Sequence, residues 1–188
     1  MLNLSPCLKQ YQRLQDWREV QRIAVEDNLI QSRTASSAKR RVREILGRLA
    51  LLSSPQLKLL ESGSVAEQQY LLWIAVCKQY SFIHDFAVEV LREKFLRMDL
   101  LLSADEYLYF FDSKAEWHEK LEKLKPSTCK KLQQVLFKMM REAEIISTEN
   151  MIIPALPTGG LVKVFAKENL NWLRVLPVAE IDINRWRD

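Results

Sequence analysis

Lysine and arginine side chains are concentrated in two short segments of this 188-residue chain. Residues 31–48 contain six basic residues and one acidic residue, and residues 125–141 contain five basic residues and no acidic residue. The formal charge of the whole chain is only +4, so the remainder of the chain is net acidic. Cations clustered in this way are the electrostatic footprint of a protein that binds the phosphates of a nucleic acid.

The first basic segment has the periodicity of an amphipathic helix over residues 34–52. Thr34 is of a type that caps a first turn, and the predicted buried stripe comprises Ala35, Ala38, Val42, Ile45, Leu46 and Leu49. Hydroxyls and cations beside the positive end of a helix suit a phosphate oxygen. The candidate nucleic-acid-binding residues of this segment are Arg33, Thr34, Ser36, Ser37, Lys39, Arg40, Arg41, Arg43 and Arg48.

A merely solvated helix face is the alternative interpretation of this segment. Solvated faces usually mix charges of both signs, because oppositely charged residues four positions apart stabilise a helix. Residues 39–48 contain five basic residues against Glu44 alone. This imbalance favours nucleic-acid contact.

The second basic segment predicts a helix over residues 127–143. Its expected buried stripe comprises Leu132, Val135, Leu136, Met139 and Met140. The candidate nucleic-acid-binding residues are Ser127, Thr128, Lys130, Lys131, Gln134, Lys138 and Arg141. Gln134 adds the capacity for paired hydrogen bonds to an adenine edge. The same pattern turns Phe137 outward, which fits a protein interface better than a DNA groove, so a partner-binding surface is the alternative.

Apolar residues recur at helical spacing along most of the chain, which predicts a mainly α fold in the form of a compact multi-helix bundle. Candidate capping boxes that begin at Asp16, Ser64, Ser103 and Ser113 support this assignment. The predicted helices cover residues 16–28, 34–52, 55–61, 65–79, 81–98, 104–112, 114–123 and 127–143.

The pattern changes after residue 143. Two β-branched runs around a polar turn predict a small β-hairpin over residues 145–153, and residues 173–178 are a candidate further strand. Two short helices, a basic helix and a hairpin follow one another in the order of a winged helix-turn-helix. We therefore expect an N-terminal helical domain over residues 1–100 and a winged-helix-like domain over residues 101–188.

The sequence contains no motif that names a catalyst, a cofactor site or a metal site. Cys7, Cys77 and Cys129 are far apart and lack the spacing of zinc ligands. His84 and His118 belong to no metal-binding motif, and we interpret both as ordinary core or surface histidines. We expect a protein that is not an enzyme and that binds no cofactor and no metal.

The longest apolar runs, such as residues 70–76, are much shorter than the roughly 20 residues that cross a bilayer. The N-terminus lacks the basic region and apolar run of a signal peptide. We therefore expect a cytoplasmic protein without a membrane partner.

Several segments resemble the BrxA family of bacteriophage exclusion (BREX) defence systems. The resemblance covers most of the chain and is carried by residues 28–41, 72–77, 86–96, 114–118 and 130–137. Residues 86–96 and the Lys-Ala-Glu-Trp-His sequence at 114–118 are its most distinctive parts. It implies a helical fold similar to that of the antitermination factor NusB.

The resemblance also implies a function. A member of this family is expected to be a non-enzymatic accessory protein that binds double-stranded DNA beside the methyltransferase and ATPase components of the system. Its expected partners are double-stranded DNA and other BREX defence proteins. Two alternatives remain: a protein–protein adaptor within the defence complex, and an RNA-binding protein of the antitermination type, which would unstack bases onto aromatic side chains.

Overall fold

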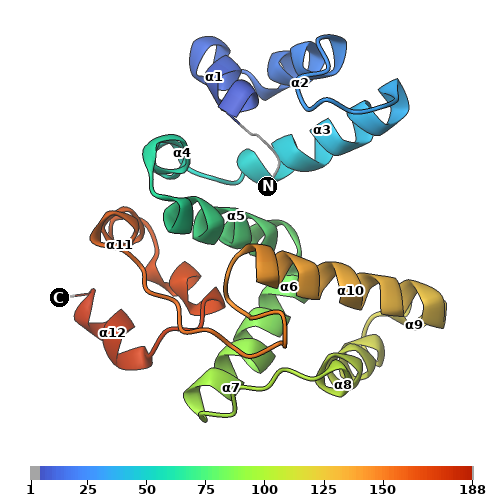
Figure 1. Cartoon of the computed structure of the whole chain (residues 1–188), viewed down its shortest axis with the longest axis vertical. Coiled ribbons are helices and arrows are strands. Elements are labelled where there is room, and N and C mark those ends of the chain that lie inside the picture. Colours follow the sequence, from blue (N-terminus) through green and yellow to red (C-terminus); the bar gives the residue numbers. More distant parts are fainter. Residues whose placement is uncertain (1–4, 188) are drawn as a thin grey trace.

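The computed structural model describes residues 5–187 and is almost entirely helical (Figure 1). The prediction of a mainly α fold is confirmed. The elements are α1 (Ser5–Leu14), α2 (Trp17–Glu26), α3 (Ala35–Leu49), α4 (Ser54–Ser62), α5 (Val65–Gln79), α6 (Ser81–Phe86), a π-helix η1 (Ala87–Arg92), α7 (Glu93–Leu96), α8 (Ala104–Ala115), α9 (Glu119–Glu122), α10 (Pro126–Glu142), α11 (Gly159–Ala166), a 3₁₀-helix η2 (Leu170–Val175) and α12 (Glu180–Arg185).

Helix α5 lies at the centre of the fold, with α1 to α4 on one side of it and α10 to α12 on the other (Figure 1). Nearly all of its residues after the first turn are buried, including Leu71, Trp73 and Ile74. A helix that is apolar around most of its circumference is stable only when other elements cover it on several sides. The Trp73 indole N–H also donates a 2.8 Å hydrogen bond to the Val175 carbonyl, which ties α5 to η2.

Side chains at the helix starts account for several of the observed boundaries. The capping boxes Ser64–Glu67 and Ser103–Glu106 are present as predicted. Asp16 caps α2 by accepting a 2.8 Å hydrogen bond from an amide of the first turn, whereas Glu19 pairs with Arg22 instead of completing a box.

The prediction of a capped helix over 114–123 is wrong. Ser113 lies inside α8, where its hydroxyl donates to the Phe110 carbonyl, and α8 continues to Ala115. Only Glu119–Glu122 forms a further helical turn before α10.

The predicted helix over 81–98 is observed as a continuous helical segment from Ser81 to Leu96 that includes the π-helix η1. Arg92 ends η1 and is buried against the Glu180 carboxylate, to which Arg174 also donates. Partial burial by itself would raise the pKa of Glu180, but Arg174 and Arg92 outweigh this effect and hold the pKa below its usual value. One carboxylate thus fixes the start of α12 to η1 and η2.

The β-structure is smaller than predicted. Residues 145–153 reverse direction through a single antiparallel bridge between Ile146 and Ile152, and a second bridge joins Leu101 to Met151. No strand ladder forms within residues 5–187, so the expected β-hairpin is not confirmed. The segment is instead stabilised by burial of its isoleucines, because Ile145, Ile146 and Ile152 pack into the core rather than against one another across a hairpin.

The candidate strand over 173–178 is wrong, because η2 occupies Leu170–Val175 and the chain then runs buried to Val178. Helices α1, α11 and α12 were not predicted from the sequence. All three are short, and they contribute Cys7, Leu161 and Ile183 to the core. Short helices owe most of their stability to such packing, so their local sequence signals are weak.

The hydrophobic core is continuous from Cys7 to Ile183. It therefore includes residues from both predicted domains, and the boundary near residue 100 stays a prediction; residues 1–4 and 188 of those domains lie outside the described part of the chain. None of the helices between residues 5 and 187 is long and apolar enough to span a membrane.

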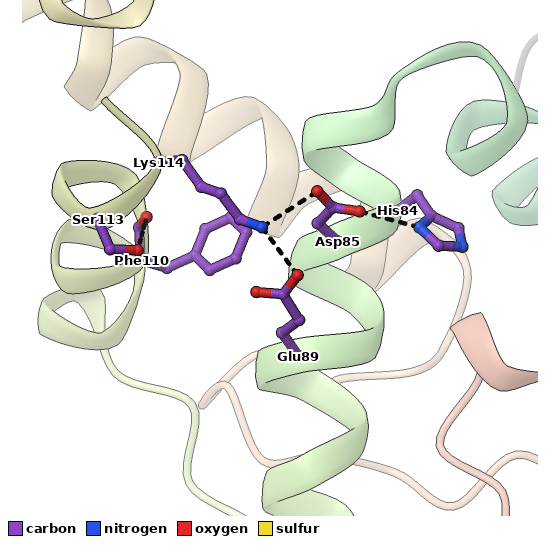
Figure 2. A network of polar contacts seen from close by, with 6 residues as sticks. All are labelled: His84, Asp85, Glu89, Phe110, Ser113 and Lys114. Carbon is purple, nitrogen blue, oxygen red and sulfur yellow. Dashed lines mark hydrogen bonds and ion pairs between the residues drawn. The ribbon is translucent and has the colours of Figure 1, made fainter. Parts of the chain in front are cut away.

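A polar network joins α6 and η1 to α8 (Figure 2). The Lys114 ammonium lies 3.1 Å from the Asp85 carboxylate and 2.8 Å from that of Glu89, over the ring of Phe110. His84 contacts the other side of Asp85 at 3.1 Å. Partial burial by itself would raise the pKa of Asp85, but hydrogen bonds with His84 and Lys114 outweigh it and hold the pKa below its usual value of 3.8.

We expect Lys114→Met to lower the free energy of unfolding at neutral pH by about 1 kcal/mol. A carboxylate whose pKa is lowered in the folded state stabilises the fold above its usual pKa and loses this effect as the pH falls through the lowered value. The difference between wild type and Lys114→Met should therefore shrink between about pH 5 and pH 2 in urea titrations. Lys120→Met on α9 is the control, and a difference that does not change with pH would contradict the assignment.

Leu71→Ala should lower the free energy of unfolding by about 2–5 kcal/mol, because it removes a fully buried side chain from α5 and leaves a cavity. Val65→Ala on the same helix, at a position that is 64% exposed, should change the free energy by less than about 0.5 kcal/mol. Chemical denaturation measures both changes, and equal effects would show that α5 is not the buried centre of the fold.

Candidate nucleic-acid interface

Helix α3 presents a broad cationic face to solvent. Its buried stripe is as predicted at five positions, whereas Ala35 is exposed because it lies in the first turn. Five exposed cations have no carboxylate within 4.0 Å among residues 5–187: Arg33, Lys39, Arg40, Arg41 and Arg43. These positive charges repel one another, and no ion pair within the described residues offsets this repulsion.

Arg48 differs from these cations because protein groups already engage it. Its guanidinium donates to the Gln79 side chain at 3.3 Å, lies 3.8 Å from the Glu44 carboxylate and covers the ring of Tyr80. The Tyr80 hydroxyl donates a 2.6 Å hydrogen bond to Glu44, and burial together with this bond raises the pKa of Tyr80. Arg48 therefore stabilises the contact between α3 and the end of α5.

The start of α3 is capped as predicted. The Thr34 hydroxyl accepts a 3.3 Å hydrogen bond from the Ser37 amide and donates to the Ser37 hydroxyl at 3.0 Å. Ser36 is exposed beside them. Thr34 thus serves the helix itself, and the Ser36 hydroxyl lies 3.3 Å from the Thr34 hydroxyl at the positive end of the helix.

The loop before α3 is fixed by the side chain of Asn28. Asn28 has a left-handed backbone with φ 48°, and its amide both accepts from the Ser32 N–H at 2.8 Å and donates to the Ser32 carbonyl at 2.9 Å. These two bonds set the position from which Arg33 and Thr34 enter α3.

We expect Asn28→Ala to lower the free energy of unfolding by about 2 kcal/mol, since it removes two hydrogen bonds and places a side chain poorly suited to the left-handed region. Asn28→Gly removes the same bonds without the backbone strain, so its effect should be smaller. Urea denaturation measures both variants, and an Asn28→Ala protein as stable as wild type would contradict this role.

Helix α10 is rotated relative to the prediction. Its buried residues are Cys129, Leu136, Phe137 and Met140. The outward orientation predicted for Phe137 is wrong, and so is the burial predicted for Leu132 and Val135, which are 43% and 41% exposed. The observed buried stripe includes Cys129 and Phe137. Leu132 and Val135 are also apolar, so the sequence did not show which side of the helix is buried.

The predicted binding residues of α10 have different surroundings. One exposed stripe, with spacings of three and four residues, contains Ser127, Lys131, Gln134 and Lys138. Lys138 also lies 3.8 Å from Glu142, and Arg141 is half-buried and donates to the Asn150 side chain at 2.9 Å. Lys130 lies apart from the stripe, beside a groove between α8, α9 and α10. Thr128 is exposed in the first turn.

The two basic helices border one cavity of about 140 Å³ over α5. Its lining includes Ile45 and Arg48 of α3, Leu72 and Val76 of α5, and Met139 of α10. Both helices extend in the same direction from α5 (Figure 1). The structure therefore brings parts of the two predicted segments near each other over α5.

The cysteines and histidines do not form a chemical site in the described part of the chain. The three cysteines are buried and unpaired, and burial raises the pKa of the Cys77 thiol well above its usual value, which makes it a poor nucleophile. Between residues 5 and 187, His, Cys, Asp and Glu side chains form no group of three or more suited to a metal ion.

Comparison with known proteins identifies the family. The chain matches the BrxA family over residues 4–169. It belongs to the BrxA family. Two curated relatives are called "BREX protein BrxA": one from Bacillus cereus (strain H3081.97), 25% identical over 70% of this chain and 66% of the relative, and one from Escherichia coli O9:H4 (strain HS), 28% identical over 71% and 62%. The chain thus spans slightly less than two thirds of each curated BrxA relative.

A solved structure shares the fold of this BrxA family member. It is an uncharacterized protein from Magnetospirillum magneticum, with a TM-score of 0.73 and 18% identity, and the match covers 94% of this chain and 93% of the other. At this identity the likeness concerns the fold alone.

Proposed function

We propose that this BrxA family member binds double-stranded DNA through phosphate contacts from α3 and α10, as a non-enzymatic accessory protein of BREX phage defence. The observation that carries the proposal is the set of five exposed cations without an ion pair among the described residues: Arg33 directly before α3 and four cations on it. Binding to phosphates would relieve the repulsion between these unpaired cations, and it would release the counterions condensed on the DNA. The names of its relatives support a place beside other BREX proteins.

The exposed stripe of α10 supplies the second contact. Lys131 and Lys138 would contact phosphates, and Gln134 between them is placed to reach a base edge. Helices α8, α9 and α10 follow one another as in a helix-turn-helix, no hairpin wing forms among residues 5–187, and we keep α10 as the proposed recognition helix. Arg48, Arg141 and Thr34 act mainly through the fold, because protein groups already bind them.

The adaptor alternative has lost the observation that favoured it on α10, since Phe137 is buried. RNA binding stays an outcome of the test. Preference for structured or single-stranded RNA over duplex DNA in direct competition would replace the present proposal.

The test is fluorescence anisotropy of a labelled duplex of about 30 base pairs, with Arg40→Glu and Lys131→Glu compared with wild type. Each reversal should weaken binding by about tenfold, and by the same factor for unrelated DNA sequences, because a phosphate contact carries no sequence information. Lys163→Glu is the matched control on α11, which lies at the opposite end of the molecule from the exposed ends of α3 and α10 (Figure 1). Binding that is insensitive to both reversals, or equally sensitive to Lys163→Glu, would refute the assignment.

A further inference from the structure

A groove of about 830 Å³ lies between α8, α9 and the first turns of α10. Its apolar lining includes Leu108 and Phe111 of α8, Leu121 of α9 and Leu124 before α10. The volume is within the range of about 300–1,000 Å³ that holds a specific ligand. Helix α9 has a single turn, which is too short to cover the apolar side of α8.

Carboxylates dominate the charged lining of the groove. Asp112, Glu116 and Glu122 line it together with one amine, Lys130. None of the three carboxylates has a cation within 4.0 Å in the described part of the chain. The groove therefore presents an apolar floor with an acidic rim, which repels phosphates and attracts cations.

Trp117 lies next to Glu116 in the turn between α8 and α9 and is 83% exposed. Its indole ring does not contribute to the core, unlike Trp73. Trp117 directly follows Glu116, which lines the groove, and tryptophan is among the residue types most enriched in the hot spots of protein interfaces.

We propose that this groove binds a basic amphipathic helix of a protein partner. The 12 residues of α8 span about 18 Å, which matches about three turns of a docked helix. Leucine-like side chains of that helix would fill the apolar floor, lysine or arginine on its flanks would pair with the three carboxylates, and Trp117 would cover one edge.

The acidic rim separates this surface from the proposed DNA contacts. Phosphates would meet Asp112, Glu116 and Glu122 as like charges, so the groove is not an extension of the DNA-binding face. A second copy of this chain does not offer the required helix: the apolar stripe of α3 is buried, and α10 exposes Leu132 and Val135 alone among its large apolar side chains, too few for a groove about three turns long. A partner protein is the occupant that fits the charge.

The probe for the test is a fluorescein-labelled Leu/Lys amphipathic peptide of about 14 residues, with a Leu/Glu peptide of the same pattern as the opposite-charge control. Anisotropy should report binding of the Leu/Lys peptide to the intact chain, and the combined variant Asp112→Asn, Glu116→Gln, Glu122→Gln should weaken it by about tenfold or more. The absence of Leu/Lys binding, or equal binding of the Leu/Glu peptide, would overturn the proposal.

Leu108→Glu and Leu132→Glu form a matched pair, because the two leucines are 42% and 43% exposed and only Leu108 lines the groove. Leu108→Glu should weaken peptide binding by about tenfold or more, whereas Leu132→Glu should change it by less than about twofold. Equal effects of the two would place the peptide elsewhere.

Circular dichroism checks that each variant remains folded. The three-carboxylate variant should bind duplex DNA at least as tightly as wild type, because it removes charges that repel phosphates, so failure of the groove proposal is distinguishable from failure of the DNA-binding proposal.

Discussion

Burial of α5 is the constraint on which the rest of the structure depends. This helix carries apolar or satisfied polar side chains around most of its circumference, so α3, α4, α6, α10 and η2 must all pack against it. Each of these helices turns its apolar stripe inward, which leaves its polar stripe facing solvent. Exposure of the cations of α3 and α10 is a direct consequence.

In the described part of the chain, the cations divide into those paired with carboxylates and those without such a partner. Arg48, Arg92 and Lys114 lie in networks with carboxylates and hold helices together. Arg40, Arg43 and their neighbours on α3 have no such partner among residues 5–187 and contribute repulsion instead. The concentration of unpaired cations in this one short segment supports the proposed anionic ligand there. The acidic groove beside Trp117 has the opposite sign and suits a different kind of partner.

Features with a strong local signal could be predicted from the sequence. The start of α3 and both ends of α5 follow from apolar periodicity and from caps at Thr34 and Ser64, which act within a few residues, whereas α3 ends three residues before its predicted end. The phase of α10 could not be fixed, because Leu132 and Val135 are as apolar as Leu136 and Phe137, and tertiary packing decides which pair is buried. The β-branched runs at 145–153 have strand propensity. In the structure their isoleucines at 145, 146 and 152 are buried in the core, and one bridge forms within the segment.

The candidate site was predicted from residue types alone. The structure shows which of these residues are exposed and which already contact other protein groups. Exposure of Arg40 follows from helix periodicity, whereas exposure of Lys131 depends on the phase of α10, and the engagement of Arg48 by Gln79 depends on contacts between distant segments. The groove of α8 and α10 was not predicted, since Leu108 and Leu121 look like core residues in the sequence. The groove is recognised only in the structure, where the single turn of α9 leaves these leucines uncovered.

The salt dependence of duplex binding tests most directly whether α3 and α10 contact the same DNA through phosphates. Slopes of log affinity against log salt would be measured for wild type, Arg40→Gln, Lys131→Gln, the double variant and the control Lys163→Gln. The account predicts that each single neutralisation lowers the magnitude of the slope by about 0.9, and the double variant by about 1.8. Slopes that remain at the wild-type value, as for Lys163→Gln, would contradict it.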